Sequence, residues 1–229
     1  MPALKSLITS VLLPVAAIAR VKRTYITKAD ASFDKSLTSR GQVGVVGPNV
    51  PAELAELNGY YGPADQIVIP ADFSSEHNHA GFLSLVEAVQ SGRLVLASEI
   101  VIYGPQAPPG ALPEKFRYAG FADSLREIYE GKCVVFAPNQ NAVGMQNKVW
   151  EAVCAGRRVL AGANAAGGLV DSPLVSRYMD GTDLPGALEN LVSGASNPDR
   201  CENWRENNIL RGPKDADMFA FLVEGDSVL

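Results

Sequence analysis

The stretch KCVVFAPNQNAVGMQNKVWEAVCAGRRVLA, residues 132–161, decides the fold. Its mostly apolar start, Lys132 to Phe136, predicts a buried strand, and Val159-Leu160-Ala161 predicts the next one. Between them a polar loop leads into an amphipathic helix, which we expect to run from Gly144 to Ala155 and to end at Gly156. A strand, a helix and a second strand in this order predict a βαβ unit with parallel strands.

The same alternation continues before this unit. Further strands are expected at Arg23–Thr27, Gln42–Val46, Gln66–Pro70, within Leu94–Tyr103 and at Phe116–Ala119, and further helices over Ala80–Gln90 and after a cap at Asp123. We therefore predict an α/β fold, a Rossmann-like parallel sheet with helices on both faces. Ligands of such sheets bind beyond the carboxyl ends of the strands, here after Ile69, Gly120, Phe136 and Ala161.

The composition allows one large buried core and disfavours a general nucleic-acid binder. Of the 229 residues 47% are hydrophobic, and the formal net charge is −5, whereas nucleic-acid binding requires clustered cations. The first 40 residues nevertheless carry seven Lys or Arg against two Asp. We expect an apolar and basic helix with a connector at residues 1–40, and the Rossmann-like domain at residues 41–229.

The N-terminal segment has three interpretations. Lys5 precedes an apolar run, Val11 to Ala19, that resembles a signal peptide but is too short to span a bilayer. A helix docked on a partner chain or touching an anionic membrane surface is preferred to a cleaved signal, and a solvated arm is an equal alternative. Cys133, Cys154 and Cys201 do not form a spaced framework, so we expect reduced core thiols in a cytoplasmic protein.

The loop and helix start within residues 138–151 indicate a site for an anion. Gly144 lets the backbone approach a ligand closely, and the first turn of a helix presents free amides. Lys148 and Glu151 are three residues apart and therefore lie on the same side of the helix. The alternative is a surface ion pair on an ordinary amphipathic helix. The chain has no G-x-G-x-x-G, Walker or G-x-S-x-G motif, which disfavours dehydrogenases, P-loop enzymes and α/β-hydrolases.

The segment resembles the donor-site signature of the group-1 (family 4) retaining glycosyltransferases of GT-B fold. Their pattern is approximately P-x(n)-G-x-x-x-K-x-x-E-A-x-A-x-G-x-P-V-V, and this chain matches it at Pro138, Gly144, Lys148, Glu151-Ala152, Gly156 and Val159-Leu160. Looser similarities lie at Val45–Val50, Asn78, Tyr118–Phe121 and Ala165–Leu169. Val143 stands where the family commonly has a first Glu, and no Arg or Lys clamp occurs between Ile69 and Arg93.

The resemblance implies roles for individual residues of a nucleotide-sugar site. Glu151 would accept hydrogen bonds from the ribose hydroxyls, and Lys148 would place a positive charge near the diphosphate. Gly144 and Met145 would offer backbone N–H groups to the diphosphate or sugar, and the backbone around Phe121 would meet the base. Five further polar residues would line the donor loops, namely His77, Asn78, Asn139, Gln146 and Asn147.

The segment Glu76-His77-Asn78-His79 also allows a metal site or a plain exposed loop. A bare His-x-His without further ligands nearby is a weak metal signal, so no metal and no cofactor are expected. The resemblance implies transfer of a hexose from a nucleotide diphosphate sugar, retaining and metal-independent, to an unknown acceptor. The alternatives are a non-catalytic nucleotide-sugar-binding or assembly subunit, in which a partner chain or second copy completes the acceptor site, and an unrelated flavodoxin-like binding domain.

Overall fold

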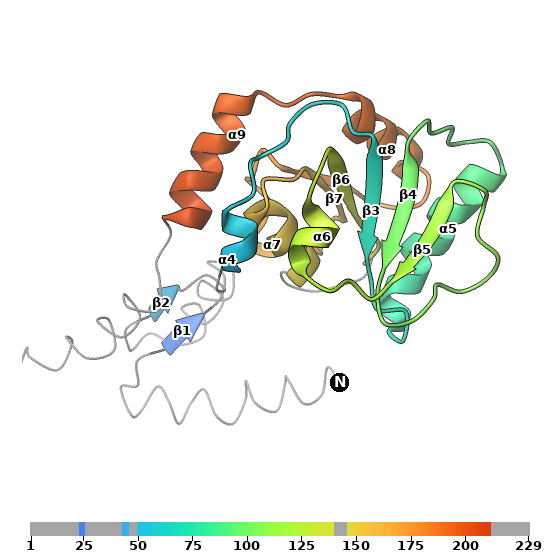
Figure 1. Ribbon diagram of the computed structural model, residues 1–229, viewed down its shortest axis with the longest axis horizontal. Coiled ribbons are helices and arrows are strands. Elements are labelled where there is room, and N and C mark those ends of the chain that lie inside the picture. Colours follow the sequence, from blue (N-terminus) through green and yellow to red (C-terminus); the bar gives the residue numbers. More distant parts are fainter. Residues whose placement is uncertain (1–22, 26–42, 46–49, 140–145, 212–229) are drawn as a thin grey trace, which may run out of the picture. The chain divides into compact units, whose positions relative to one another are not determined.

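The computed structural model describes residues 23–25, 43–45, 50–139 and 146–211, in two units (Figure 1). The first unit contains the strands β1 (Arg23–Tyr25) and β2 (Val43–Val45), which pair in parallel with Arg23 opposite Val43. Both short strands were predicted. The expected N-terminal helix lies outside the described residues, and the expected boundary at residues 40 and 41 stays a prediction.

The second unit, Val50–Leu210, contains a six-stranded parallel sheet in the order β5-β4-β3-β6-β7-β8. The strands are β3 (Gln66–Pro70), β4 (Glu99–Tyr103), β5 (Phe116–Gly120), β6 (Cys133–Ala137), β7 (Val159–Gly162) and β8 (Val175–Tyr178). The chain builds outward from β3 to β5, and β6 then returns to pair with the other side of β3. The point where the strand order reverses therefore lies between β3 and β6, which is where open α/β sheets bind ligands.

Helices cover both faces of this sheet (Figure 1). The α-helices are α4 (Ala52–Ala55), α5 (His79–Gln90), α6 (Leu125–Tyr129), α7 (Asn147–Cys154), α8 (Leu184–Ser193) and α9 (Pro198–Arg205). Two short 3-10 helices, η2 (Glu76–Asn78) and η3 (Gly167–Leu169), and a π-helical segment, η4 (Glu206–Leu210), complete them. One face packs on α5 and α8, and the other packs on α4, α6, α7 and α9. None of the helices in the described ranges is both long and apolar enough to cross a membrane.

The side chains of the strands alternate between two separate cores. In β6, Cys133, Val135 and Ala137 pack on the α7 side, while Val134 and Phe136 pack on the α5 side. Because both sides are buried, the strand needs apolar residues at every position, as its sequence has. The three cysteines are free and buried, which confirms the prediction of core thiols, and burial raises the pKa of Cys154 to about 12.

Two predicted helix starts are corrected by backbone geometry. Helix α7 begins at Asn147 instead of Gly144, because Gln146 is extended with φ −94° and ψ 136°. The cap of α6 is Ser124, one residue after the predicted Asp123, and its hydroxyl accepts from the Glu127 amide at 3.2 Å. Asn197 caps α9, since its side chain accepts from the Arg200 amide at 2.9 Å.

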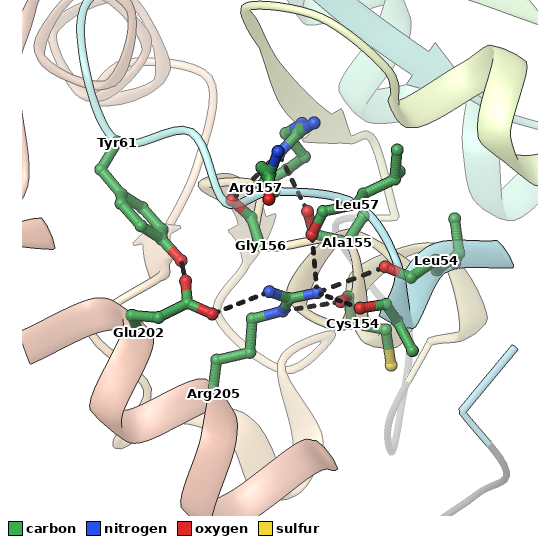
Figure 2. Close-up of polar contacts among 11 residues, drawn as sticks. Leu54, Leu57, Tyr61, Cys154, Ala155, Gly156, Arg157, Glu202 and Arg205 are labelled. Carbon is green, nitrogen blue, oxygen red and sulfur yellow. Dashed lines mark hydrogen bonds and ion pairs between the residues drawn. The ribbon is translucent and has the colours of Figure 1, made fainter. Parts of the chain in front are cut away.

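Two buried arginines fasten the helices on the α7 side of the sheet (Figure 2). Arg205 at the end of α9 is 2% exposed, and its Nε donates to the Cys154 carbonyl at 2.8 Å. Its Nη2 donates to the carbonyls of Leu54 and Leu57 at 3.3 and 3.1 Å. The guanidinium thus binds carbonyl groups in and just after α4 and at the end of α7.

Arg157 makes the second set of contacts. Its Nε donates to the Tyr129 carbonyl at 2.7 Å, and its Nη1 donates to the carbonyls of Asn58 and Ala155 at 2.8 and 2.9 Å. These groups belong to the end of α6, the loop after α4 and the end of α7. The two arginines therefore hold the ends of three helices in a fixed relation.

The predicted helix stop at Gly156 is confirmed and gives a first testable prediction. Gly156 has φ +65°, and a Cβ there would lie 2.7 Å from the Cα of Gly59. We expect Gly156→Ala to lower the free energy of unfolding by about 2–4 kcal/mol, because left-handed strain and a backbone clash add. Gly92 has φ +72° with nothing within 4 Å, so Gly92→Ala should cost only about 1 kcal/mol. Urea unfolding of both variants measures the difference, and equal losses would contradict the clash.

Candidate functional site

A cleft of about 680 Å³ opens at the carboxyl edge of the sheet, beside the point where the strand order reverses. It is formed by the ends of β3 and β4, the loop after β5, α6, the first turns of α7, and one residue of α4. Its polar lining residues are Glu53, Asp72, Tyr103, Asp123, Ser124, Asn147, Lys148 and Glu151. Residues from the predicted anion segment and from the loop after Gly120 thus meet in one place.

Lys148 lies half-buried in the first turn of α7, between two buried asparagines. Its Nζ donates to Oδ1 of Asn78 at 2.6 Å and to Oδ1 of Asn139 at 2.7 Å. Burial lowers the pKa of Lys148 to about 8, although the carboxylates of Glu151 and Asp72 raise it in part. The side chain is thus an ammonium at neutral pH, fixed by neutral partners.

Both asparagines are themselves held. The Nδ2 group of Asn78 donates to the Asp72 carbonyl at 2.5 Å, and that of Asn139 donates to Oε1 of Gln146 at 2.9 Å. These bonds turn the two amide oxygens toward Lys148. The position of the Lys148 ammonium is therefore set by contacts from two separate segments of the chain, one after β3 and one after β6.

Glu151 lies about one turn further along α7 and lines the same cleft. Its Oε2 accepts a hydrogen bond from the hydroxyl of Tyr129 at 2.9 Å. Tyr129 is fully buried, and burial together with the Glu151 carboxylate raises its pKa well above the ordinary value, so it stays a donor. Within the described ranges no ion pair joins Lys148 to Glu151, so the alternative of a surface ion pair is not what the structure forms.

Of the remaining predicted site residues, some line the cleft and others do not. Phe121 is 79% exposed on the lining of the cleft, and Asn147 also lines it. Gln146 acts through its contact with Asn139, and His77 lies exposed on η2, outside the lining. Gly144 and Met145 lie outside the described residues.

The loop with the two histidines offers little to a metal. His79 contacts the Phe73 carbonyl through Nε2 at 2.8 Å, whereas His77 is exposed. Among the residues with described positions, no group of three or more His, Cys, Asp or Glu is placed to hold a metal ion. Whether the chemistry of this chain is independent of metal stays a prediction.

The sequence analysis gave no role in the site to Tyr129, Glu53 or Asp123. Tyr129 ends the helix that precedes β6, and its hydroxyl reaches α7 only because the two helices pack on the same face of the sheet. Glu53 and Asp123 add carboxylates to the lining, beside Asp72 and Glu151. Lys148 is the one cation among the described lining residues, which include these four carboxylates. It is therefore the only charged side chain of that lining that attracts an anion.

No family model and no curated protein matches this chain. Several solved structures do match it. TarM matches with a TM-score of 0.62 and 13% identity over 87% of this chain and 42% of TarM. The GtfA/B complex matches with a TM-score of 0.63 and 15% identity, over 89% of this chain and 45% of the matched chain of the complex. AviGT4, a glycosyltransferase involved in avilamycin A biosynthesis, matches with a TM-score of 0.51 and 16% identity, over 82% of this chain and 61% of AviGT4.

These matches settle the fold. The described domain has the Rossmann-like α/β fold of GT-B glycosyltransferases. The chain spans less than half the length of TarM and of the matched chain of the GtfA/B complex. At such low identity the likeness is one of fold, and the specific resemblance to family 4 stays a prediction.

Proposed function

We propose that this chain binds a nucleotide diphosphate sugar in the cleft and takes part in glycosyl transfer. The observation that carries the proposal is the pair Lys148 and Glu151, held on α7 by separate neutral partners at the reversal point of the sheet. A cation and a free carboxylate oxygen at this edge suit a ligand with a diphosphate and a vicinal diol. The glycosyltransferases among the solved neighbours, and a TarM structure with UDP, add support.

Each group then has a chemical task in this proposal. Glu151 accepts hydrogen bonds from the ribose hydroxyls, and the exposed ring of Phe121 meets the base at the rim. Lys148 and the first turn of α7 face the diphosphate, on which negative charge grows as the sugar departs. The Lys148 ammonium is fixed before the ligand arrives, so little reorganisation is needed when that charge develops. We extend the proposal to a hexose donor with a retaining, metal-independent transfer.

A second candidate is a nucleotide-sugar-binding or assembly subunit, completed by a partner chain or a second copy. It is favoured by the single described cation among four carboxylates of the lining. The GtfA/B match was solved as a complex, and this chain spans less than half of the chain it matches there. In this candidate the partner supplies the acceptor site and the cations that the described lining lacks.

Calorimetric titration with UDP, GDP and ADP, and then with their sugars, tests the proposal. We expect one nucleotide to bind with a micromolar dissociation constant, and Glu151→Ala to weaken it about thirtyfold, because charge-assisted hydrogen bonds to the ribose are lost. Glu189→Ala is the matched control, since Glu189 is exposed on α8 across the sheet. Failure of all three nucleotides to bind would sink the proposal.

Turnover separates the two candidates. Release of the nucleotide from its sugar by the chain alone favours a transferase. Binding of the nucleotide without any release favours the subunit. That assignment gains further support if a co-purified partner chain restores release.

A further inference from the structure

Tyr129 is hydrogen-bonded both through its side chain and through its backbone. Its hydroxyl donates to Oε2 of Glu151 at 2.9 Å, and its backbone carbonyl accepts from Nε of Arg157 at 2.7 Å. Arg157 is 3% exposed and also binds the carbonyls of Asn58 and Ala155. The hydroxyl of Tyr129 therefore has a fixed place relative to α7, and so does the carboxylate that it binds.

This contact decides which way Glu151 faces. Lys148 is three residues earlier on the same helix, at a spacing that ordinarily lets a carboxylate and an ammonium pair. Tyr129 holds Glu151, while Asn78 and Asn139 hold Lys148. Because each charge has its own neutral partner, neither one neutralises the other, and both stay available to a ligand.

The contact also decides what Glu151 can accept. An ionised carboxylate has about four acceptor positions on its two oxygens, and Tyr129 takes one of them on Oε2. The positions left over lie on both oxygens, at an orientation that the tyrosine fixes. Two neighbouring hydroxyl groups are the donors that match such a fixed pair of oxygens.

We propose that Tyr129 is a positioning residue that aims the Glu151 carboxylate at both hydroxyls of a ribose and thereby makes the cleft select ribonucleotides over 2′-deoxyribonucleotides. The inference rests on the proposed function and adds a specificity determinant to it. Tyr129 acts only through Glu151, since it is fully buried and is not among the lining residues.

The test is the ratio of the dissociation constants for a 2′-deoxynucleotide and its ribonucleotide. UDP, GDP and ADP are titrated beside dUDP, dGDP and dADP into the wild-type chain and into Tyr129→Phe. We expect the wild type to prefer the ribonucleotide, and Tyr129→Phe to reduce that preference about tenfold, because the unheld carboxylate no longer aims at the 2′-hydroxyl. The ring stays in place, so the variant keeps its packing.

Tyr61→Phe is the matched control. Tyr61 also donates its hydroxyl to a glutamate, Glu202, but outside the lining of the cleft (Figure 2). Its loss should lower the melting temperature without changing the ribonucleotide preference. Two results would overturn the inference and leave the proposed function standing. In the first, Tyr129→Phe weakens the binding of the ribonucleotide and the deoxynucleotide equally. In the second, Tyr129→Phe leaves the preference unchanged while Glu151→Ala abolishes binding. If no nucleotide binds the wild type, both fall together.

Discussion

Lys148→Met should weaken the binding of a nucleoside diphosphate about 100-fold and change the binding of the matching nucleoside little. The lining carries four carboxylates, Glu53, Asp72, Asp123 and Glu151, and among its described residues only Lys148 opposes them. A unit charge about 4 Å from a phosphate contributes roughly 4 kcal/mol at the effective dielectric of a protein surface, before losses to desolvation. A loss of nearly 3 kcal/mol is therefore a reasonable net effect, and it corresponds to the factor of about 100.

The nucleoside and the diphosphate must be titrated in parallel to separate the loss of the Lys148 charge from a loss of stability. Lys148→Met leaves the amide oxygens of Asn78 and Asn139 without their shared donor, so some stability is lost as well. Lys132→Met is the control, because Lys132 is exposed directly before β6 and outside the cleft. An equal loss for nucleoside and diphosphate would assign Lys148 a structural role only.

The same residue predicts how affinity depends on pH. Burial lowers the pKa of Lys148 to about 8, against the opposing effect of Glu151 and Asp72. A bound diphosphate favours the ammonium, so binding takes up a proton once the free chain has lost it. The wild-type affinity should therefore fall about tenfold between about pH 7 and pH 9, and the fall should vanish in Lys148→Met. A flat wild-type profile over this range would contradict a diphosphate contact at Lys148.

The sheet could be predicted from the sequence wherever a strand is buried on both faces. The strand Gln66–Pro70 is apolar from Ile67 onward and was predicted with its observed bounds. The edge strand β8 was missed, because Ser176 and Arg177 at its centre are exposed and give it no apolar run. Helix α9 was also missed, since it packs through Cys201 and Arg205 instead of an apolar stripe. Sequence periodicity detects apolar burial and does not detect burial of a charged group that is fully hydrogen-bonded.

Only some residues of the candidate site could be predicted from the sequence, and none of their contacts could. The spacing of Lys148 and Glu151 indicated a polar helix face, and the resemblance added Asn78. That Asn78 binds Lys148, from a segment 70 residues earlier, depends on how β3 and β6 lie side by side. The hydroxyl of Tyr129 reaches Glu151 for a similar reason, since α6 and α7 share one face of the sheet. Such contacts follow from tertiary packing, which no local pattern encodes.

Arg205→Met should lower the free energy of unfolding by about 3–5 kcal/mol, as expected when one partner of a buried charge network is removed. Methionine fills a comparable volume but cannot donate. The carbonyls of Leu54, Leu57 and Cys154 then lose a buried donor at the ends of α4 and α7, and Glu202 loses its ion pair. Urea unfolding measures the loss. Arg200→Met on the exposed side of the same helix should cost under about 0.5 kcal/mol.

The size of this effect follows from the kind of acceptor that Arg205 satisfies. A buried ion pair between two side chains can often be replaced by apolar residues without loss, because both partners are removed together. Backbone carbonyls cannot be removed, so their need for a donor persists in every variant. These carbonyls lie at the ends of α4 and α7, the helices that carry Glu53, Lys148 and Glu151 at the cleft. A nucleotide that binds there should therefore raise the folded fraction of the destabilised Arg205→Met variant. A loss under about 1 kcal/mol would mean that water reaches these carbonyls and that Arg205 does not hold the ends of α4 and α7 to α9.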